Sequence, residues 1–242
     1  MKKAFHAKAG GTAKKPFDRL EETDPERALV RYAEIGDLAG VRRMLAAQAD
    51  VNAVIFFNNG VETVEDTGLH AAAGGGHVAV VAALIEAGAD INAKINDDET
   101  PLIQAAMNGW AQTVERLVRE KAEIDHAETF DGYTALHWAS RLGREGTVKV
   151  LLAAGADMSV KSKQGETAED MICAQIGMGH QEYQVLYDKI QDAFQGAHEN
   201  RRRAAETALR EKDMLAAALA HAPVLQKEIS VGKPLRLKPR HF

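Results

Sequence analysis

With 242 residues, 45% of them apolar and 5% aromatic, the chain is long enough to bury a substantial core and has the composition of a globular protein. No apolar run approaches the roughly 20 residues that a membrane-spanning helix needs, and no apolar segment of a signal peptide follows the lysine-rich start, so we expect a cytoplasmic protein. The single cysteine, Cys173, excludes an intrachain disulfide and a cysteine-based zinc site, and we expect a buried thiol.

The formal net charge of −5 conceals a segregation of charge along the chain. Residues 1–19 carry six basic side chains and one acidic, residues 224–242 carry five and one, and the segment 20–223 has a net charge of −14. Phosphate binding needs clustered Lys and Arg, so the acidic body disfavours nucleic acid as its ligand.

The first residues predict a flexible arm followed by a helix. Residues 1–23 form a basic arm of low hydrophobicity. Asp24-Pro25-Glu26 then supplies a capping side chain, a proline at the first helical position and an acid near the positive end of the helix dipole. We therefore expect the segment 24–53 to be the first helical unit.

The segment 54–66 contains two β-favouring runs on either side of Asn58-Asn59-Gly60. Such runs around Asn-Gly predict a hairpin. The alternative is an ordered loop in which Phe56 and Phe57 fill a gap in the core, and the sequence leaves both open. In the hairpin, these two phenylalanines are candidate partner-binding residues, because repeat stacking does not need them.

From Thr67 onward, a pattern of about 33 residues recurs. Its marker residues are Thr67, Thr100, Thr134 and Thr167, then Gly76, Gly109 and Gly143, then Ala89, Ala122 and Ala156. The threonine hydroxyl can cap a first helix, and Pro101 suits the first helical position. The glycines at 76, 109 and 143 are expected to end the first helix of each unit in a left-handed conformation, and Gly88 and Gly155 the second.

The second helix of each unit carries one apolar stripe. Its residues are Val80, Val81, Leu84 and Ile85, then Val114, Leu117 and Val118, then Val148, Leu151 and Leu152. One pair of short helices cannot bury such a stripe alone, so neighbouring units must stack into an elongated solenoid.

The chain resembles the ankyrin-repeat family in its period and in three motifs. These motifs are Thr100-Pro101-Leu102-Ile103, Thr134-Ala135-Leu136-His137 and the unit end Gly88-Ala89-Asp90. The chain departs from that pattern at Gly68 and Ala135, where proline is usual, and at Ile103, where histidine is usual. The resemblance implies an all-α solenoid of helix-turn-helix units with hairpin fingers over residues 24–194. Its parts are an N-terminal capping repeat (24–53), an inserted hairpin (54–66), repeats (67–160) and a degraded C-terminal repeat (161–194).

Within the degraded repeat, Ile172, Val185, Leu186 and Ile190 predict a less regular closing helix, and one more helix and a tail follow. Residues 195–222 are rich in strong helix formers and should form a C-terminal helix that Pro223 ends. Residues 223–242 form a basic tail.

The sequence contains no recognisable catalytic or metal-binding motif. Gly74-Gly75-Gly76 follows a helix rather than a strand, which favours an interhelix turn over a phosphate loop. His70 and His137 lie in the repeat motif, where the family uses histidine for structural hydrogen bonds. We therefore expect that the protein is not an enzyme and that it has no catalytic residue, metal, cofactor or small-molecule substrate.

The resemblance implies a module that binds another protein through a concave face of fingers and first helices. Family alignment places these residues outward: Asn96, Asp97, Glu99, Met107 and Asn108, then Phe130, Asp131, Tyr133, Arg141 and Leu142. Phe130 has the alternative of packing on a neighbouring finger. A second hypothesis is an adaptor or inhibitor that acts through the terminal helix and the basic tail around 233–240. In either case we expect a monomer.

Overall fold

The computed structural model describes residues 24–58, 63–174 and 180–230. The predicted basic arm (1–23) and the tail from residue 231 onward lie outside these residues. The chain divides into two units, residues 1–194 and 195–242, and each is described by itself.

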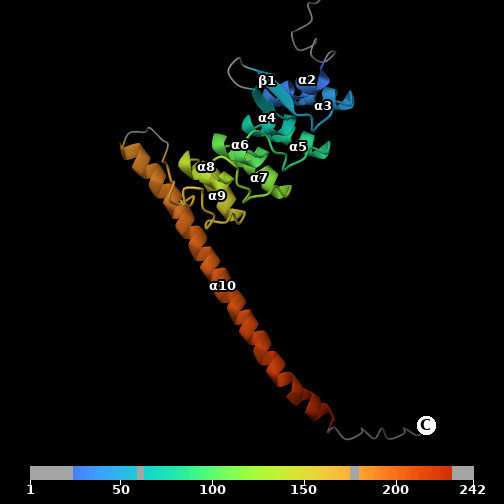
Figure 1. The fold of residues 1–242 in the computed structure, drawn as a ribbon. Helices are drawn as coiled ribbons and strands as arrows, with labels where there is room; N and C mark the ends of the chain where they lie inside the picture. The colour runs from blue at the N-terminus through green and yellow to red at the C-terminus, as the bar shows by residue number, and fades with distance from the viewer. Residues whose placement is uncertain (1–23, 59–62, 175–179, 231–242) are drawn as a thin grey trace, which may run out of the picture. The chain divides into compact units, whose positions relative to one another are not determined.

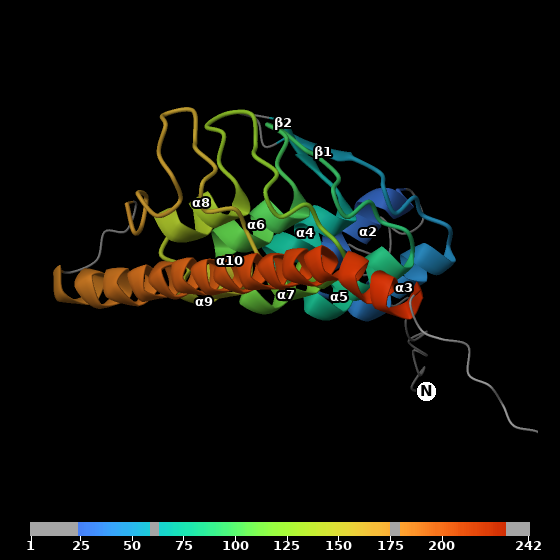
Figure 2. The ribbon, with the colours of Figure 1, turned by 90° about the horizontal axis from the view of Figure 1, so that it is seen from below.

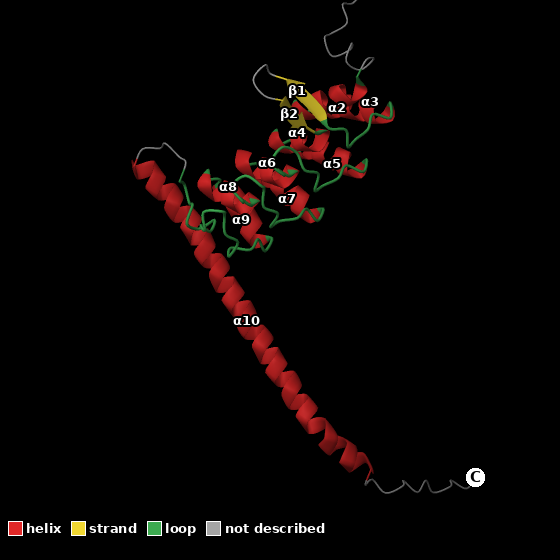
Figure 3. Cartoon of the chain, viewed as in Figure 1, coloured by secondary structure: helices red, strands yellow, loops and turns green. Residues whose placement is uncertain are grey.

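The first unit is a stack of paired helices (Figures 1 and 3). The first helices of the pairs are α2 (Pro25–Glu34), α4 (Gly68–Gly74), α6 (Pro101–Asn108) and α8 (Ala135–Arg141). The second helices are α3 (Leu38–Ala46), α5 (Val78–Glu86), α7 (Ala111–Arg119) and α9 (Glu145–Ala153). Each first helix contacts the first helix of the next pair, and the second helices do the same. Two helical layers result, as the predicted solenoid requires.

The first helices begin at the predicted capping residues. The side chains of Thr67, Thr100 and Thr134 each accept a hydrogen bond from the backbone N–H three residues later. Asp24 caps α2 in the same way. Pro101 occupies the first position of α6, where no backbone N–H is needed. The cap is kept in α4 and α8, which lack this proline.

The turns that follow the helices are left-handed where the sequence predicts it. Gly109, for example, ends α6 with φ +82°, a conformation that strains residues with a Cβ. The other predicted turn glycines, at 76, 88, 143 and 155, also have positive φ angles.

The residue after each interhelix glycine bonds to the preceding unit. His77 Nε2 donates to the Glu34 carbonyl (2.9 Å), Trp110 Nε1 to the Gly74 carbonyl (2.7 Å) and Arg144 Nε to the Met107 carbonyl (3.0 Å). These acceptors lie at the ends of α2, α4 and α6, where backbone carbonyls have no partner within the helix. Three different side chains therefore make one repeated contact between units.

The apolar stripe of the second helices forms the interrepeat core. The buried members are Val80, Val81, Leu84, Val114, Leu117, Val148 and Leu151, and the half-buried ones are Ile85, Val118 and Leu152. Leu84 and Leu117 are fully buried. Because α5 and α7 contact each other, these two leucines stabilise the stack as well as their own units.

The inserted segment is an antiparallel hairpin of β1 (Ile55–Asn58) and β2 (Thr63–Asp66). The pairing sets Ile55 opposite Asp66 and Phe57 opposite Val64. The hairpin prediction is therefore confirmed, and Phe56, which is 54% exposed, does not fill a core gap. The turn 59–62 and the surroundings of the Phe57 side chain lie outside what is described.

The fifth unit is degraded, since residues 161–174 form turns and no helix. Cys173 is buried, and its N–H donates to the Ser140 carbonyl (2.8 Å). Burial raises the pKa of the Cys173 thiol, as expected of an unreactive cysteine. The start of α10 (His180–Ser230) closes the stack with the fully buried Ile190 and Phe194.

Helix α10 joins the predicted closing helix and the predicted C-terminal helix into one, and it extends beyond the predicted end. It begins at His180, and Pro223 does not end it, because the helix continues to Ser230. A proline removes one backbone hydrogen bond, but here the strong helix formers that precede it keep the helix continuous. The boundary between the two units falls within α10, after Phe194.

Candidate partner-binding surface

Four fingers project to one side of the helix layers (Figure 2). Finger 1 is the hairpin Ile55–Asp66, and fingers 2, 3 and 4 are the loops 94–99, 126–133 and 160–166. Antiparallel bridges close the bases of the loops, at Ile95 and Glu99, Ala127 and Thr134, and Lys161 and Thr167. We call the fingers together with α4, α6 and α8 the recognition face.

Finger 3 is organised around a buried carboxylate. Glu128 is 4% exposed, and its oxygens accept hydrogen bonds from the backbone N–H groups of Phe130 (2.5 Å), Asp131 (3.0 and 3.1 Å) and Tyr133 (2.9 Å). Such charge-assisted bonds are stronger than neutral ones and hold the turn in one conformation. At its tip, the Phe130 side chain is 71% exposed, so it does not pack on a neighbouring finger.

Finger 3 is also bonded to the fingers on both sides. The Thr129 N–H donates to the Asp97 carbonyl of finger 2 (2.7 Å). The Lys163 N–H of finger 4 donates to the Asp131 carbonyl (2.9 Å). Fingers 2, 3 and 4 therefore form one hydrogen-bonded row.

An aromatic and arginine cluster lies beside finger 3. Arg141 Nη1 donates to the Tyr133 hydroxyl (2.8 Å), and its guanidinium lies 5.3 Å from the Tyr133 ring centroid and 5.8 Å from that of Trp138. Tyr133 also stacks on His137, with centroids 5.7 Å apart. Tyr133 is only 4% exposed, so its predicted outward position is wrong. It orients the half-buried Arg141 instead.

His70 and His137 make the predicted structural hydrogen bonds. Their Nε2 atoms donate to the backbone carbonyls of Glu99 (3.1 Å) and Glu166 (3.3 Å) in the next finger. Their Nδ1 atoms lie 2.8 and 2.9 Å from the hydroxyls of the capping threonines. Since a carbonyl only accepts, each ring is the Nε2–H tautomer. Burial lowers the pKa of both histidines, that of His70 to about 4.

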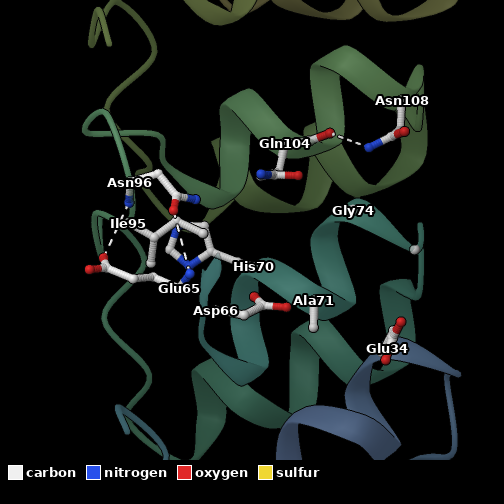
Figure 4. A pocket seen from close by; sticks show the side chains of 11 residues that line it. Glu34, Glu65, Asp66, His70, Ala71, Gly74, Ile95, Asn96, Gln104 and Asn108 are labelled. Carbon is white, nitrogen blue, oxygen red and sulfur yellow. Dashed lines mark hydrogen bonds between the residues drawn. The ribbon is translucent and has the colours of Figure 1, made fainter. Parts of the chain in front are cut away.

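A pocket of about 400 Å³ opens on the recognition face between α2, finger 1, α4 and α6 (Figure 4). Its polar lining residues are Glu34, Glu65, Asp66, His70, Asn96, Gln104 and Asn108. The Asn96 N–H donates to Glu65 Oε2 (3.3 Å), which joins fingers 1 and 2. The pocket therefore has acidic and amide groups on several of its walls.

Two carboxyl groups at or next to this pocket, those of Asp66 and Glu99, have raised pKa values. Burial raises the pKa of Asp66 to about 7; the Thr67 N–H opposes the shift and the Glu34 carboxylate adds to it. Burial also raises the pKa of Glu99, while a hydrogen bond from Gln104 opposes that shift. Burial thus destabilises the ionised forms of Asp66 and Glu99.

Replacing Asp66 by asparagine should stabilise the protein at pH 8 and have little effect near pH 4. A raised carboxyl pKa means that stability is lost as pH rises through the interval from 3.8 to about 7. Because the pKa rises from 3.8 to about 7, removing the charge should raise the free energy of unfolding by up to about 4 kcal/mol. Urea unfolding of both proteins at each pH measures the difference.

The stability of the wild type must be compared with that of Asp66→Asn, because His70 also makes the stability of each protein depend on pH. Its lowered pKa makes stability fall as pH drops from 6.5 to about 4, which opposes the contribution of Asp66. Both proteins contain His70, so its contribution cancels in the difference. A difference that does not change between pH 4 and pH 8 would show that Asp66 keeps an ordinary pKa.

The predicted contact residues differ in exposure. Phe56, Asn96, Asp97, Asn108 and Phe130 are exposed, whereas Glu99, Met107, Asp131, Arg141 and Leu142 are half-buried. The structure brings Asn96 and Asn108 together at the pocket, and Phe130 and Asp131 at the end of finger 3. The Met107 carbonyl bonds to Arg144, a contact within the fold.

Sequence reasoning missed Asp66 and Glu128. Asp66, Glu99 and Tyr133 each immediately precede a capping threonine, so the repeat alignment that pointed to the last two was a signal for Asp66 as well. Glu128 had no such signal, because its importance comes from the backbone N–H groups that the loop turns toward it.

The described residues contain neither a cluster of metal ligands nor a membrane-spanning helix. Among them, no three or more His, Cys, Asp or Glu side chains are grouped so that they could hold a metal ion. In the same part of the chain, no helix combines the length and apolarity needed to cross a membrane.

Comparison with known proteins places the repeats in a family. Residues 69–162 match the family model described as ankyrin repeats (3 copies). The chain is 33% identical over 150 residues to the transient receptor potential cation channel subfamily A member 1 homolog of Caenorhabditis elegans, a match that covers 62% of this chain and 12% of the relative. It is 38% identical over 82 residues to the ankyrin repeat and SAM domain-containing protein 6 of Mus musculus (34% of this chain, 9% of the relative).

A third relative, the neurogenic locus notch homolog protein 1 of Xenopus laevis, is 37% identical over 152 residues, which is 62% of this chain and 6% of that protein. The chain thus spans 12% or less of each of these three relatives. The likeness is to one segment of each, and it does not transfer the activity of the whole protein.

Proposed function

We propose, from the premise that this chain is an ankyrin-repeat protein, that it is a non-enzymatic module that binds a partner protein through its recognition face. Ankyrin repeats are in general protein interaction modules. The observation that supports this face is the row of fingers 2, 3 and 4, from which Phe130 projects on a turn held by Glu128.

The physical advantage of this arrangement is preorganisation. A loop that is already ordered loses little conformational entropy when a partner binds, so more of the contact energy appears as affinity. Aromatic and arginine side chains are enriched at interaction hot spots. Phe130 and Arg141 are such residues, and Glu128 and Tyr133 hold them in place.

Shortening finger 1 by deleting residues 58–64 should leave the melting temperature nearly unchanged and weaken partner capture. The hairpin is an insertion, and Phe56 is exposed on it, so stacking of α2 and α4 does not depend on its tip. Thermal unfolding and pull-down from a lysate of the cells of origin, read by mass spectrometry, measure the two effects. If the deletion unfolds the protein, finger 1 belongs to the core.

The second candidate is an adaptor or inhibitor that acts through the terminal helix and basic tail. The exposed Leu209, Met214 and Leu215 in the α10 segment after Phe194 favour it, because exposed apolar side chains on a helix are candidate contacts. A pull-down with the chain truncated after residue 230 tests the tail, and Leu209→Ala tests the helix. Partner capture that is lost on truncating the tail or in Leu209→Ala, but that does not depend on the fingers, would favour the adaptor hypothesis.

A further inference from the structure

The pocket of the recognition face exists because one unit carries unusually small residues. Along the first helices, Ala71 and Gly74 of α4 occupy positions that later units fill with larger side chains, which are Gln104 and Met107 in α6, and Trp138 and Arg141 in α8. A Cβ added to Gly74 would lie 3.4 Å from Gln104 Oε1. The space is therefore specific to this unit and leads to the side chains of α6.

The amide side chains of α6 present acceptors to this space. Gln104 Nε2 donates to Glu99 Oε2 (2.7 Å), and Asn108 Nδ2 donates to the Gln104 carbonyl (3.0 Å). These bonds assign the amide nitrogens and leave Gln104 Oε1 and Asn108 Oδ1 as acceptors (Figure 4). The opposite walls carry the carboxylates of Glu34, Glu65 and Asp66.

No lysine or arginine is among the described residues that line the pocket. Glu34 forms an ion pair with Arg31 (2.5 Å), which uses part of one carboxylate. A buried carboxyl such as Asp66, with a pKa near 7, gains most from a nearby cation, because the cation offsets the cost of desolvating the charge.

We propose that this pocket binds the guanidinium group of an arginine side chain of the partner protein. The inference rests on the proposed function and identifies what the partner contributes. An arginine suits the site better than a lysine, since its planar array of five N–H donors can bond to carboxylate and amide oxygens on several walls at once. The cavity volume lies within the range of small-ligand sites.

The direct test is an NMR titration of the full chain with N-acetylarginine amide. Its control ligand is N-acetylcitrulline amide, which has the same shape and no charge. We expect the arginine compound to bind with a dissociation constant on the order of millimolar, because a single side chain makes few contacts. The amide resonances that shift should be confined to residues 65–75, 95–96 and 104–108. The citrulline compound should bind at least about tenfold more weakly, and N-acetyllysine amide should lie between the two.

Three variants separate charge from shape. Asp66→Asn removes a charge, and Gly74→Met fills the cavity with the side chain that α6 carries at the equivalent position. Each should weaken arginine binding by about tenfold or more. Glu86→Gln removes an exposed charge at the end of α5, outside the pocket, and should change nothing. Folding of each variant is checked in the same spectra.

Binding should also weaken as pH falls from 8 to 6 and lose most of this dependence in Asp66→Asn. The titratable groups around Asp66 are Glu34 on α2, Glu65 on β2, His70 on α4 and Glu99 before α6. Of these, His70 is neutral in this range, because its pKa is about 4.

Three outcomes would overturn the proposal: equal binding of the citrulline compound, shifts outside the pocket, or unchanged binding in a folded Gly74→Met variant. Any of these, together with partner capture that still depends on Phe130, would reject the arginine pocket and leave the proposed function standing. Arginine binding at the pocket together with partner capture that is indifferent to the fingers and the pocket would reject the proposed function instead.

Discussion

Replacing Leu84 or Leu117 by alanine should lower the free energy of unfolding by about 2–5 kcal/mol, the range for truncation of a buried leucine. Both side chains are fully buried, and α5 and α7, which carry them, contact each other and the second helices on either side. In a stack with nearest-neighbour contacts, each truncation loosens two interfaces and leaves a cavity that the short helices cannot close.

The matched control is Leu209→Ala, the same chemical change at a side chain that is exposed in the second unit. It should change stability by less than about 0.5 kcal/mol. Urea unfolding followed by circular dichroism measures all three variants. A loss below about 0.5 kcal/mol for Leu84→Ala and Leu117→Ala would mean that the apolar stripe does not form the interrepeat core.

Replacing Phe130 by alanine should weaken binding of the captured partner by about 30-fold or more, the effect of losing an interaction hot spot. The side chain is exposed at the tip of finger 3, so the melting temperature should stay the same. Isothermal titration calorimetry with the purified partner gives the affinity. An affinity within about twofold of the wild type would remove Phe130 from the interface.

Glu128→Gln tests whether the rigidity of finger 3 matters. Glutamine keeps one acceptor oxygen but replaces the other by an amide nitrogen, which cannot accept the N–H groups that Glu128 binds. We expect both weaker binding and faster hydrogen exchange at residues 128–133. Leu209→Ala again serves as a control, because loss of affinity in that variant alone would favour the terminal-helix hypothesis.

The sequence predicted the features that repeat along the chain. The threonine caps, the left-handed glycines and the buried leucines recur at a fixed spacing and depend on local backbone geometry or helical periodicity. The sequence predicts the hairpin as one of two alternatives, because β-favouring residues around Asn-Gly also fit an ordered loop. Pairing of β1 with β2 decides between them.

Features that depend on contacts between units were harder to predict. Alignment predicts an outward position for Tyr133, yet this side chain stacks on His137, bonds to Arg141 and is buried. The pocket exists because Ala71 and Gly74 are smaller than the equivalent residues of later units, and such an exception to the repeat gives no periodic signal. Pro223 shows the reverse case, since a residue that commonly ends helices does not end α10.

The central claim is that the partner binds the recognition face. Hydrogen exchange of the full chain, with and without the captured partner, tests it most directly, because it reports on all parts of the chain in one measurement. We expect slower exchange in fingers 2 and 3 (94–99 and 126–133) and at the ends of α6 and α8, with no change in α10 beyond Phe194. Protection confined to residues 195–242, with the fingers unaffected, would contradict the claim.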